Sequence, residues 1–132
     1  MPSGSERKHH EDLVSGLYNQ MKVIFESSEQ AMFLYLDDNH KACNKKFSSL
    51  LGYKSPQEWA SVEESFLNTF VAEKNQKSLQ TAYLDAMKKM IGSTIEVTWK
   101  KKSGGTVDTI VILVPMAYSG HLFALHFVSP KV

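Results

Sequence analysis

The sequence has little of what disulfide-bonded, membrane-bound or nucleic-acid-binding chains rely on. It holds one cysteine in 132 residues, which excludes an internal disulfide and favours a reducing, cytoplasmic location. Its 15 basic and 14 acidic residues leave a net charge of +1, so no bulk field attracts nucleic acid or an anionic membrane surface. The longest apolar run, residues 110–118, is about half of the roughly 20 residues that a membrane helix needs. The opening MPSGSERKHHED lacks the apolar segment of a secretory signal.

Motifs for catalysis and for cofactor binding are missing too. The sequence has no G-x-S-x-G elbow, no P-loop and no G-x-G-x-x-G, and its spacing supports no Cys–His pair. His9 and His10 are adjacent, so their side chains are expected to diverge, while His40 and His121 fall in predicted turns. We therefore predict a protein that is not an enzyme, with no catalytic residue and no metal site.

What is present indicates one ordinary globular domain. Hydrophobic residues make up 42% and charged residues 22% of the chain, and 132 residues can bury a single core. We expect residues 1–10 to be a flexible tail, residues 11–27 an amphipathic helix, and residues 28–130 the core of the domain.

The apolar face of the first helix is the reason to separate it from the core. Val14, Leu17, Met21 and Ile24 step by three, four and three residues, so they lie on one side of a helix. Such a stripe suits packing on the domain's own core, and it equally suits a seam with the same helix of a second copy. Both readings stay open.

The next stretch predicts two strands joined by a tight turn. Residues 31–36 are apolar, and the three residues 37–39, two aspartates and an asparagine, favour turns because their side chains bond nearby backbone. Residues 41–43 then form at most a short second strand.

Helices follow in the middle of the chain. Apolar residues at helical spacing end at Gly52, and Ser55 with Pro56 has the pattern of a helix start. Residues 61–76 are helical in part. The clearest helix is predicted over residues 77–91, closed by Gly92.

After Gly92 the apolar period changes from that of a helix to that of a strand. Residues 93–102, 106–118 and 121–129 are strand-like and are separated by short turns that contain glycine, which predicts an antiparallel meander. Helices and strands that come in separate runs indicate an α+β domain with a single sheet. Because residues 110–114 are apolar without a break, both faces of this sheet need a cover: the middle helices on one, the N-terminal helix or a partner chain on the other.

This order and several local motifs resemble the PAS domain, a small sensory α+β fold. In AMFLYLDDNHKACNKKFSSLLGY a strand and an acidic turn lead to Asn44 and then to a helix ending in Gly52 and Tyr53. SPQEW resembles the start of the family's next helix, and WKKKSGGTVD resembles its hairpin before the long strand. One departure is HKAC, which is polar where the second strand is usually apolar, so this edge is expected to be short or irregular.

The resemblance implies a five-stranded antiparallel sheet with helices on one face and an N-terminal amphipathic cap helix. It also implies a non-catalytic sensory or regulatory domain of a longer signalling protein, such as a sensor kinase or a transcription regulator. A ligand pocket would be lined by residues at the matching positions, together with His126 if its strand parity turns it inward. These expected pocket residues are Phe47, Leu51, Tyr83, Met87, Val97, Val111, Leu113 and His126.

Neither cofactor signature of the family is present. Flavin-adduct members carry their reactive cysteine on a middle helix, whereas Cys43 precedes the first core helix and residues 61–76 contain no cysteine. Haem-binding members usually present a histidine from the long helix, and residues 77–91 contain none. His126 stays open as a ligand, although a lone histidine among apolar residues is more often a hydrogen-bonded core residue. The identity of any cofactor is therefore open.

Three functions remain. The first is a sensory domain that binds a small molecule in its core, forms a homodimer through its N-terminal helix, or does both. The second is a dimerisation or protein-interaction module without a ligand. The third, an isomerase-like enzyme, needs a carboxylate or histidine with a perturbed pKa inside the pocket. Its test is whether an aspartate or glutamate points into the cavity.

Overall fold

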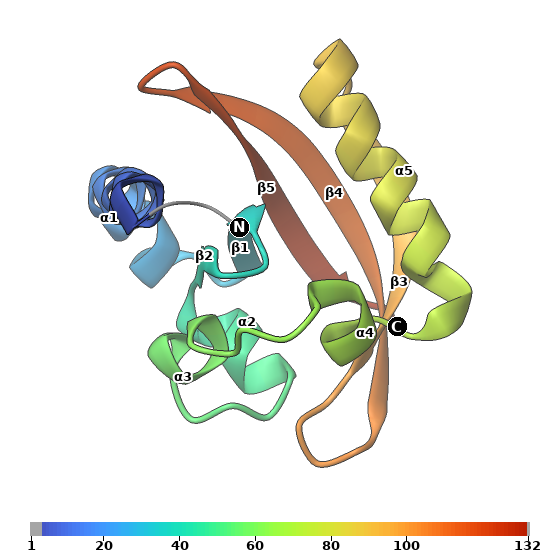
Figure 1. Cartoon of the computed structure of the whole chain (residues 1–132). Coiled ribbons are helices and arrows are strands. Elements are labelled where there is room, and N and C mark those ends of the chain that lie inside the picture. Colours follow the sequence, from blue (N-terminus) through green and yellow to red (C-terminus); the bar gives the residue numbers. More distant parts are fainter. Residues whose placement is uncertain (1–3, 132) are drawn as a thin grey trace.

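A computed structural model describes residues 4–131, with side chains from residue 8 onward. The five strands form one antiparallel sheet in the order β2-β1-β5-β4-β3 (Figure 1), which confirms the α+β class and the single five-stranded sheet. The elements in chain order are α1 (Gly4–Ser27), β1 (Ala31–Asp37), β2 (His40–Cys43), α2 (Lys45–Leu50), α3 (Pro56–Ala60), α4 (Phe66–Phe70), α5 (Glu73–Lys89), β3 (Ser93–Lys100), β4 (Thr106–Tyr118) and β5 (His121–Pro130).

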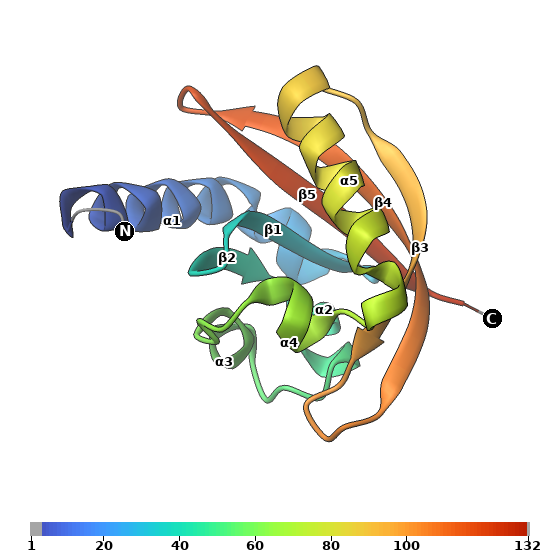
Figure 2. The same ribbon diagram turned by 45° about the vertical axis from the view of Figure 1, so that its right-hand side comes forward.

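The two faces of the sheet have separate cores. Because side chains alternate along a strand, Phe33 of β1 enters the core beneath α2–α5, while Met32 and Leu34 enter the core beneath α1. Figures 1 and 2 show α1 and α5 on opposite sides of the sheet. The arrangement confirms helices on one face and an N-terminal cap helix on the other.

Asn44 builds the corner between the first strands and the helices. Its Oδ1 accepts the N–H of Phe47 at 3.1 Å, which caps α2, and also the N–H of Met32 at 3.0 Å. Its Nδ2 donates to the carbonyl of Gln30 at 2.9 Å. One buried asparagine therefore fixes α2 against the start of β1, so this stretch makes the fold turn.

The predicted start of the next helix is also confirmed. The Oγ of Ser55 accepts the N–H of Glu58 at 3.0 Å, and Pro56 occupies the first helical position of α3.

Two helix ends differ from the sequence prediction. The first helix begins at Gly4 rather than at residue 11, so residues 4–10 of the expected tail are helical, and residues 1–3 lie outside the described part. A polar segment without an internal breaker can continue a helix, and Lys8 pairs with Asp12 at 3.5 Å one turn later.

The long helix α5 runs over residues 73–89 instead of 77–91, and its stop is Met90 in the left-handed region at φ 55°, not Gly92. Gly92 meets a different need, since a Cβ there would lie 3.2 Å from the carbonyl oxygen of Leu113 on β4.

The face beneath α1 is only partly covered. Apolar residues of α1 pack on β1 and on the end of the β4–β5 hairpin. Ile110, Ile112 and Val114 of β4 point to the same side and remain 40%, 44% and 37% exposed. The cover that the apolar sequence of β4 demands is therefore incomplete in a single chain.

Candidate functional site

The core beneath α2–α5 is filled by aromatic rings, with Phe33 at its centre. The ring of Phe33 lies 4.6 Å from that of Phe47, 5.7 Å from that of Trp59 and 5.5 Å from that of Trp99, measured between centroids. On its other side it stacks on the imidazole of His126 at 3.9 Å. All these rings are buried, so the middle of the interior is occupied by side chains.

Space remains at the edge of this aromatic core, between α4, α5 and strands β1 and β5. The cleft has a volume of about 270 Å³. That is slightly below the roughly 300–1,000 Å³ of typical small-molecule pockets, so it suits a small ligand. Its lining consists of Phe33, Tyr35, Asp38, Ser65, Phe66, Leu67, Leu79, Gln80, Tyr83, Leu84 and His126.

Two of the expected pocket residues, Tyr83 and His126, line this cleft. Met87 is partly buried against the same core, away from the cleft. The other five are buried in the core, with 0 to 1% exposure, and are also absent from the cleft wall: Phe47, Leu51, Val97, Val111 and Leu113. The expected residues thus lie on the face of the sheet beneath α2–α5, where bulky aromatic side chains fill the middle and the open space lies toward α4 and α5.

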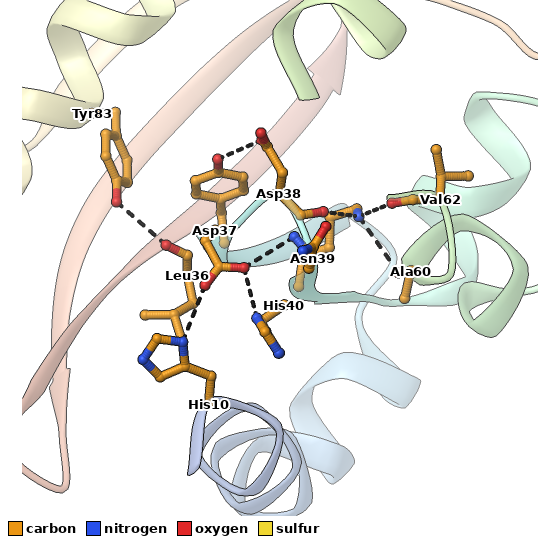
Figure 3. A network of polar contacts seen from close by, with 11 residues as sticks. His10, Leu36, Asp37, Asp38, Asn39, His40, Ala60, Val62 and Tyr83 are labelled. Atoms are coloured by element: carbon orange, nitrogen blue, oxygen red, sulfur yellow. Dashed lines mark hydrogen bonds and ion pairs between the residues drawn. The ribbon is translucent and has the colours of Figure 1, made fainter. Parts of the chain in front are cut away.

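Polar groups converge on one wall of the cleft. The hydroxyl of Tyr35 donates to Oδ1 of Asp38 at 2.8 Å, and the N–H of Phe66, at the start of α4, donates to the same oxygen at 3.1 Å. The hydroxyl of Tyr83 donates to the carbonyl of Leu36 at 3.4 Å (Figure 3). Burial raises the pKa of Tyr83, and burial together with the hydrogen bond to Asp38 raises the pKa of Tyr35. Both phenols therefore remain protonated donors.

Tyr35 and Asp38 were missed by the sequence prediction of the pocket. The sequence predicts Asp38 as a turn residue, whereas its hydrogen bond to residue 66 joins positions that no local pattern connects. Tyr35 could have been found, because it has the same strand parity as Phe33.

His126 points inward, as its parity allowed. It is 3% exposed, and its Nδ1 lies 3.1 Å from the carbonyl oxygen of Ala124, to which it donates. Burial lowers the pKa of His126 to about 3, so the imidazole is neutral near pH 7. It offers the cleft a flat neutral ring.

Lys41 explains why the short second strand is polar. The residue is 4% exposed, and its Nζ donates to the carbonyls of Asp38 at 2.7 Å and Val62 at 2.5 Å, with Ala60 at 3.5 Å. The ammonium also lies 5.5 Å from the ring centre of Trp59. Burial lowers the pKa of Lys41. The strand has four residues, and the register between β1 and β2 shifts between Tyr35 and Asp37, so the expected short and irregular edge is confirmed.

The lone cysteine has a packing role. Cys43 is 1% exposed at the end of β2, and burial raises the pKa of its thiol. A protonated, buried thiol is a poor nucleophile.

The stripe of the first helix divides between two environments. Val14, Leu17 and Met21 are 9%, 2% and 8% exposed because they pack on the sheet, whereas Ile24 is 55% exposed. Of the two readings of this stripe, packing on the domain's own core accounts for Val14, Leu17 and Met21, while Ile24 stays available to a partner.

A second polar cluster joins α1 to the turn between β1 and β2. Nδ1 of His40 lies 2.7 Å from Oδ1 of Asp37, and Nδ1 of His10 lies 3.3 Å from Oδ2 of the same carboxylate (Figure 3). His10 was expected on a tail away from His40. The structure places it on the second turn of α1, where it faces Asp37 at the end of β1 and His40 at the start of β2.

Comparisons with known proteins place the fold. No family model and no curated protein matches the chain, while solved structures do. A PAS domain of an HTR-like protein from Haloarcula marismortui is 19% identical, covers 94% of this chain and 99% of its own, and has a TM-score of 0.66. A LOV protein from Rhodobacter sphaeroides is 15% identical, with coverages of 89% and 68% and a TM-score of 0.69. The VqmA dimer from Vibrio cholerae is 12% identical, with coverages of 86% and 51% and a TM-score of 0.64.

At these identities the likeness concerns the fold. The chain is an α+β domain built on one open antiparallel sheet, and that fold is the PAS fold. Among residues 4–131, no helix has both the length and the apolar character that crossing a bilayer requires.

Proposed function

We propose that this chain is a non-catalytic sensory or regulatory PAS domain that binds a small neutral molecule in the cleft between α4, α5 and the sheet. The observation that carries the proposal is the cleft itself, an apolar space of about 270 Å³ into which the neutral polar groups of Tyr35, Tyr83 and His126 converge. Ligand pockets are typically apolar with a few well-placed polar groups. The volume favours a molecule with one ring or a short chain.

The chemistry of the wall narrows the ligand class. Phe33 and Phe66 offer aromatic surface, and among the described residues that line the cleft Asp38 alone is charged. Oδ1 of Asp38 already accepts two hydrogen bonds. An anionic ligand would therefore meet no compensating positive charge, while a neutral apolar molecule with one hydrogen-bonding group would fit.

Strand β1 offers a path from the cleft to α1. Phe33 borders the cleft, and its neighbours Met32 and Leu34 contact the core beneath α1. A ligand that binds one packing of Phe33 better than another shifts the population of that packing, and the same strand carries the shift to α1. We therefore propose that α1 is the element that transmits ligand binding to the rest of the signalling protein.

Dimerisation is the second proposed property. Ile110, Ile112 and Val114 form an exposed apolar row on β4, and Val23 and Ile24 of α1 are 77% and 55% exposed. A homodimer would cover these surfaces, so we place the contact on the outer face of β4 and the end of α1. A ligand-free dimerisation module is the alternative that this row favours.

In its proposed setting the domain belongs to a longer cytoplasmic signalling protein. The VqmA structure, of which this fold covers 51%, is described as a dimer and in terms of the DNA-binding mechanisms of LuxR-type receptors. The free buried Cys43 is consistent with a reducing compartment.

An isomerase-like enzyme is less well supported. Asp38 does line the cleft, which is the feature such an enzyme needs. Its carboxylate, however, holds the hydroxyl of Tyr35 and the first N–H of α4, so it is part of the structure of the wall.

Native mass spectrometry of the purified domain, followed by a thermal-shift screen with small neutral compounds, tests ligand binding. Leu84→Trp narrows the cleft at a residue 41% exposed, and Ser78→Trp places the same side chain on an exposed part of α5 outside the lining. We expect a co-purified or screened compound to bind the wild type and the Ser78→Trp variant, and to bind Leu84→Trp at least tenfold more weakly. Equal binding to all three proteins, or no binding at all, would leave the dimerisation module as the function.

A further inference from the structure

The polar cluster of His10, Asp37 and His40 has the composition of a metal site. One ligand atom from each residue lies within 4.8 Å of the other two. The three side chains come from α1, from the end of β1 and from the start of β2, and Figure 3 shows both imidazoles directed at the carboxylate of Asp37. Nothing in the cleft depends on them.

We infer that His10, Asp37 and His40 bind one divalent transition-metal ion, with Zn²⁺ as the best match, and that this ion fastens α1 to the β1–β2 turn. Two imidazoles and one carboxylate suit zinc and its neighbours Ni²⁺ and Cu²⁺ better than Ca²⁺ or Mg²⁺, which prefer oxygen ligands. Three protein ligands leave a fourth position for water.

Two of the three ligand pairs are spaced close to what one ion requires, and the third pair, the two imidazoles, lies within 4.8 Å. Ligands bound to zinc at about 2.0–2.1 Å lie roughly 3.0–3.4 Å from one another. The 3.3 Å between Nδ1 of His10 and Oδ2 of Asp37 already falls in this range. The 2.7 Å between Nδ1 of His40 and Oδ1 of Asp37 is a hydrogen bond that must lengthen by roughly half an ångström. The side chain of Asp37 is 40% exposed, so its carboxylate can shift by this small amount while it keeps the hydrogen bond from Asn39.

The state of His10 points independently to a missing partner. Its Nδ1 is buried from solvent and makes no hydrogen bond with any described residue, although Oδ2 of Asp37 is near. A buried ring nitrogen without a partner is unfavourable, and it is rare in stable structures. An ion between His10 and Asp37 would satisfy it.

The other two ligands are held in place by the fold. Oδ1 of Asp37 accepts the N–H of Asn39 at 3.0 Å, which fixes the carboxylate over the turn, and His40 is 8% exposed at the start of β2. The side chain of His10 is 27% exposed, so an ion can enter between His10 and Asp37. The site is thus preorganised on the core and completed by the helix.

This arrangement makes the ion a clamp. Among the described side chains, the apolar packing of α1 on the sheet begins at Leu13. The turns before Leu13 are tied to the core by the cluster of His10. Metal binding would therefore order the beginning of α1, the helix proposed to transmit ligand binding. It would do so whether or not the cleft binds a ligand.

The test is isothermal titration of ZnCl₂ and NiCl₂ into the full chain freed of any affinity tag. We expect one equivalent to bind the wild type, and His10→Gln to bind at least tenfold more weakly. His9→Gln is the matched control, because His9 is the adjacent residue and its ring lies against His121, 5.1 Å away and outside the cluster. Because His40 is buried, Asp37→Asn serves as the second variant, with circular dichroism to confirm that it folds.

A second readout separates a clamp from mere binding. Zinc should slow hydrogen exchange in residues 6–13 of the wild type and raise its melting temperature, and it should do neither in His10→Gln. Wild-type affinity no greater than that of His10→Gln would overturn the site, and an equal loss in His9→Gln would identify an adventitious surface ion only. Tight binding without a change in exchange would overturn the clamp.

Discussion

His126 is a buried histidine whose neutral form the fold requires, which makes it a source of acid sensitivity. The pKa of its imidazole is about 3 in the folded chain and 6.5 as the ordinary value, so the unfolded chain binds more protons between these two limits. Stability is therefore fully present above about pH 6.5 and is lost as the pH falls toward 3.

We predict that the free energy of unfolding decreases by up to about 1.4 kcal/mol per pH unit in this window because of His126. His126→Gln, which does not titrate, should flatten the curve, although it will lower stability near neutral pH. Urea denaturation at several values between about pH 7 and 4.5 measures the slope. The half-buried His121→Gln variant at the β4–β5 turn is the control, and an unchanged slope in His126→Gln would show that other groups cause the acid sensitivity.

Lys41 lies outside the lining of the cleft and donates a hydrogen bond to the backbone of Asp38, which belongs to that lining. We predict that Lys41→Met, which keeps the apolar stem, lowers the free energy of unfolding by about 1–3 kcal/mol, because the carbonyls of Asp38 and Val62 lose their donor. Chemical denaturation measures the change. Lys46→Met replaces an exposed lysine nearby and should cost less than about 0.5 kcal/mol. Equal costs would mean that the carbonyls of Asp38 and Val62 are satisfied by water.

Residues with local partners could be predicted from the sequence, and residues with distant partners could not. Ser55 caps a helix three residues away, and its role follows from the order Ser-Pro. Lys41 and Asp38 bond backbone of the segment 60–66, and His10 meets a turn 27 positions later. Such contacts depend on how the chain returns on itself, which no short spacing encodes.

At the scale of elements, the first helix caps one face of the sheet, and most of its apolar stripe packs on that sheet. Leu17 is 2% exposed and Ile24 is 55% exposed, although both belong to the same predicted stripe. The spacing by three and four residues could define the stripe, but not the residue at which the sheet ends beneath the helix.

Leu17 and Ile24 allow a matched comparison of a buried and an exposed position in the same predicted stripe. We predict that Leu17→Asp destabilises the domain by more than about 3 kcal/mol or releases α1, because it buries a charge without a partner. Ile24→Asp should change the stability of the monomer, measured at a concentration too low for dimerisation, by less than about 0.5 kcal/mol. Hydrogen exchange of α1, together with urea denaturation, distinguishes release of the helix from global unfolding. Rapid exchange of α1 in the wild type would contradict the cap.

In the pocket, the positions of the helices and strands could be predicted, but the space left between their side chains could not. The prediction of a single antiparallel sheet followed from periods and turns, and that of helices on one face from the resemblance to the PAS fold; both were confirmed. Five of the eight expected pocket residues became solid core because Phe33, Trp59 and Trp99 fill the middle of the domain. Their combined volume is visible in the sequence, but the way in which the rings interlock is decided by packing in three dimensions.

At the scale of the whole molecule, the sheet has one complete core and one incomplete core. The row Ile110, Ile112 and Val114 lies next to the edge strand β3, beyond the reach of α1. Exposed apolar rows of this kind mark interaction surfaces. An identical chain is the simplest partner, because two such rows can face each other across a two-fold axis.

We predict that the wild type is a dimer at about 50 µM and that Ile112→Asp is a monomer, because the carboxylate would be buried without a partner at the centre of the contact. Size-exclusion chromatography with multi-angle light scattering measures the mass directly. Ile91→Asp is the control, since Ile91 is 48% exposed but lies after α5, outside the row. A monomeric wild type would leave the row without an identical partner. A dimer that survives Ile112→Asp but dissociates with Ile24→Asp would confine the contact to the end of α1 and remove the β4 row from it.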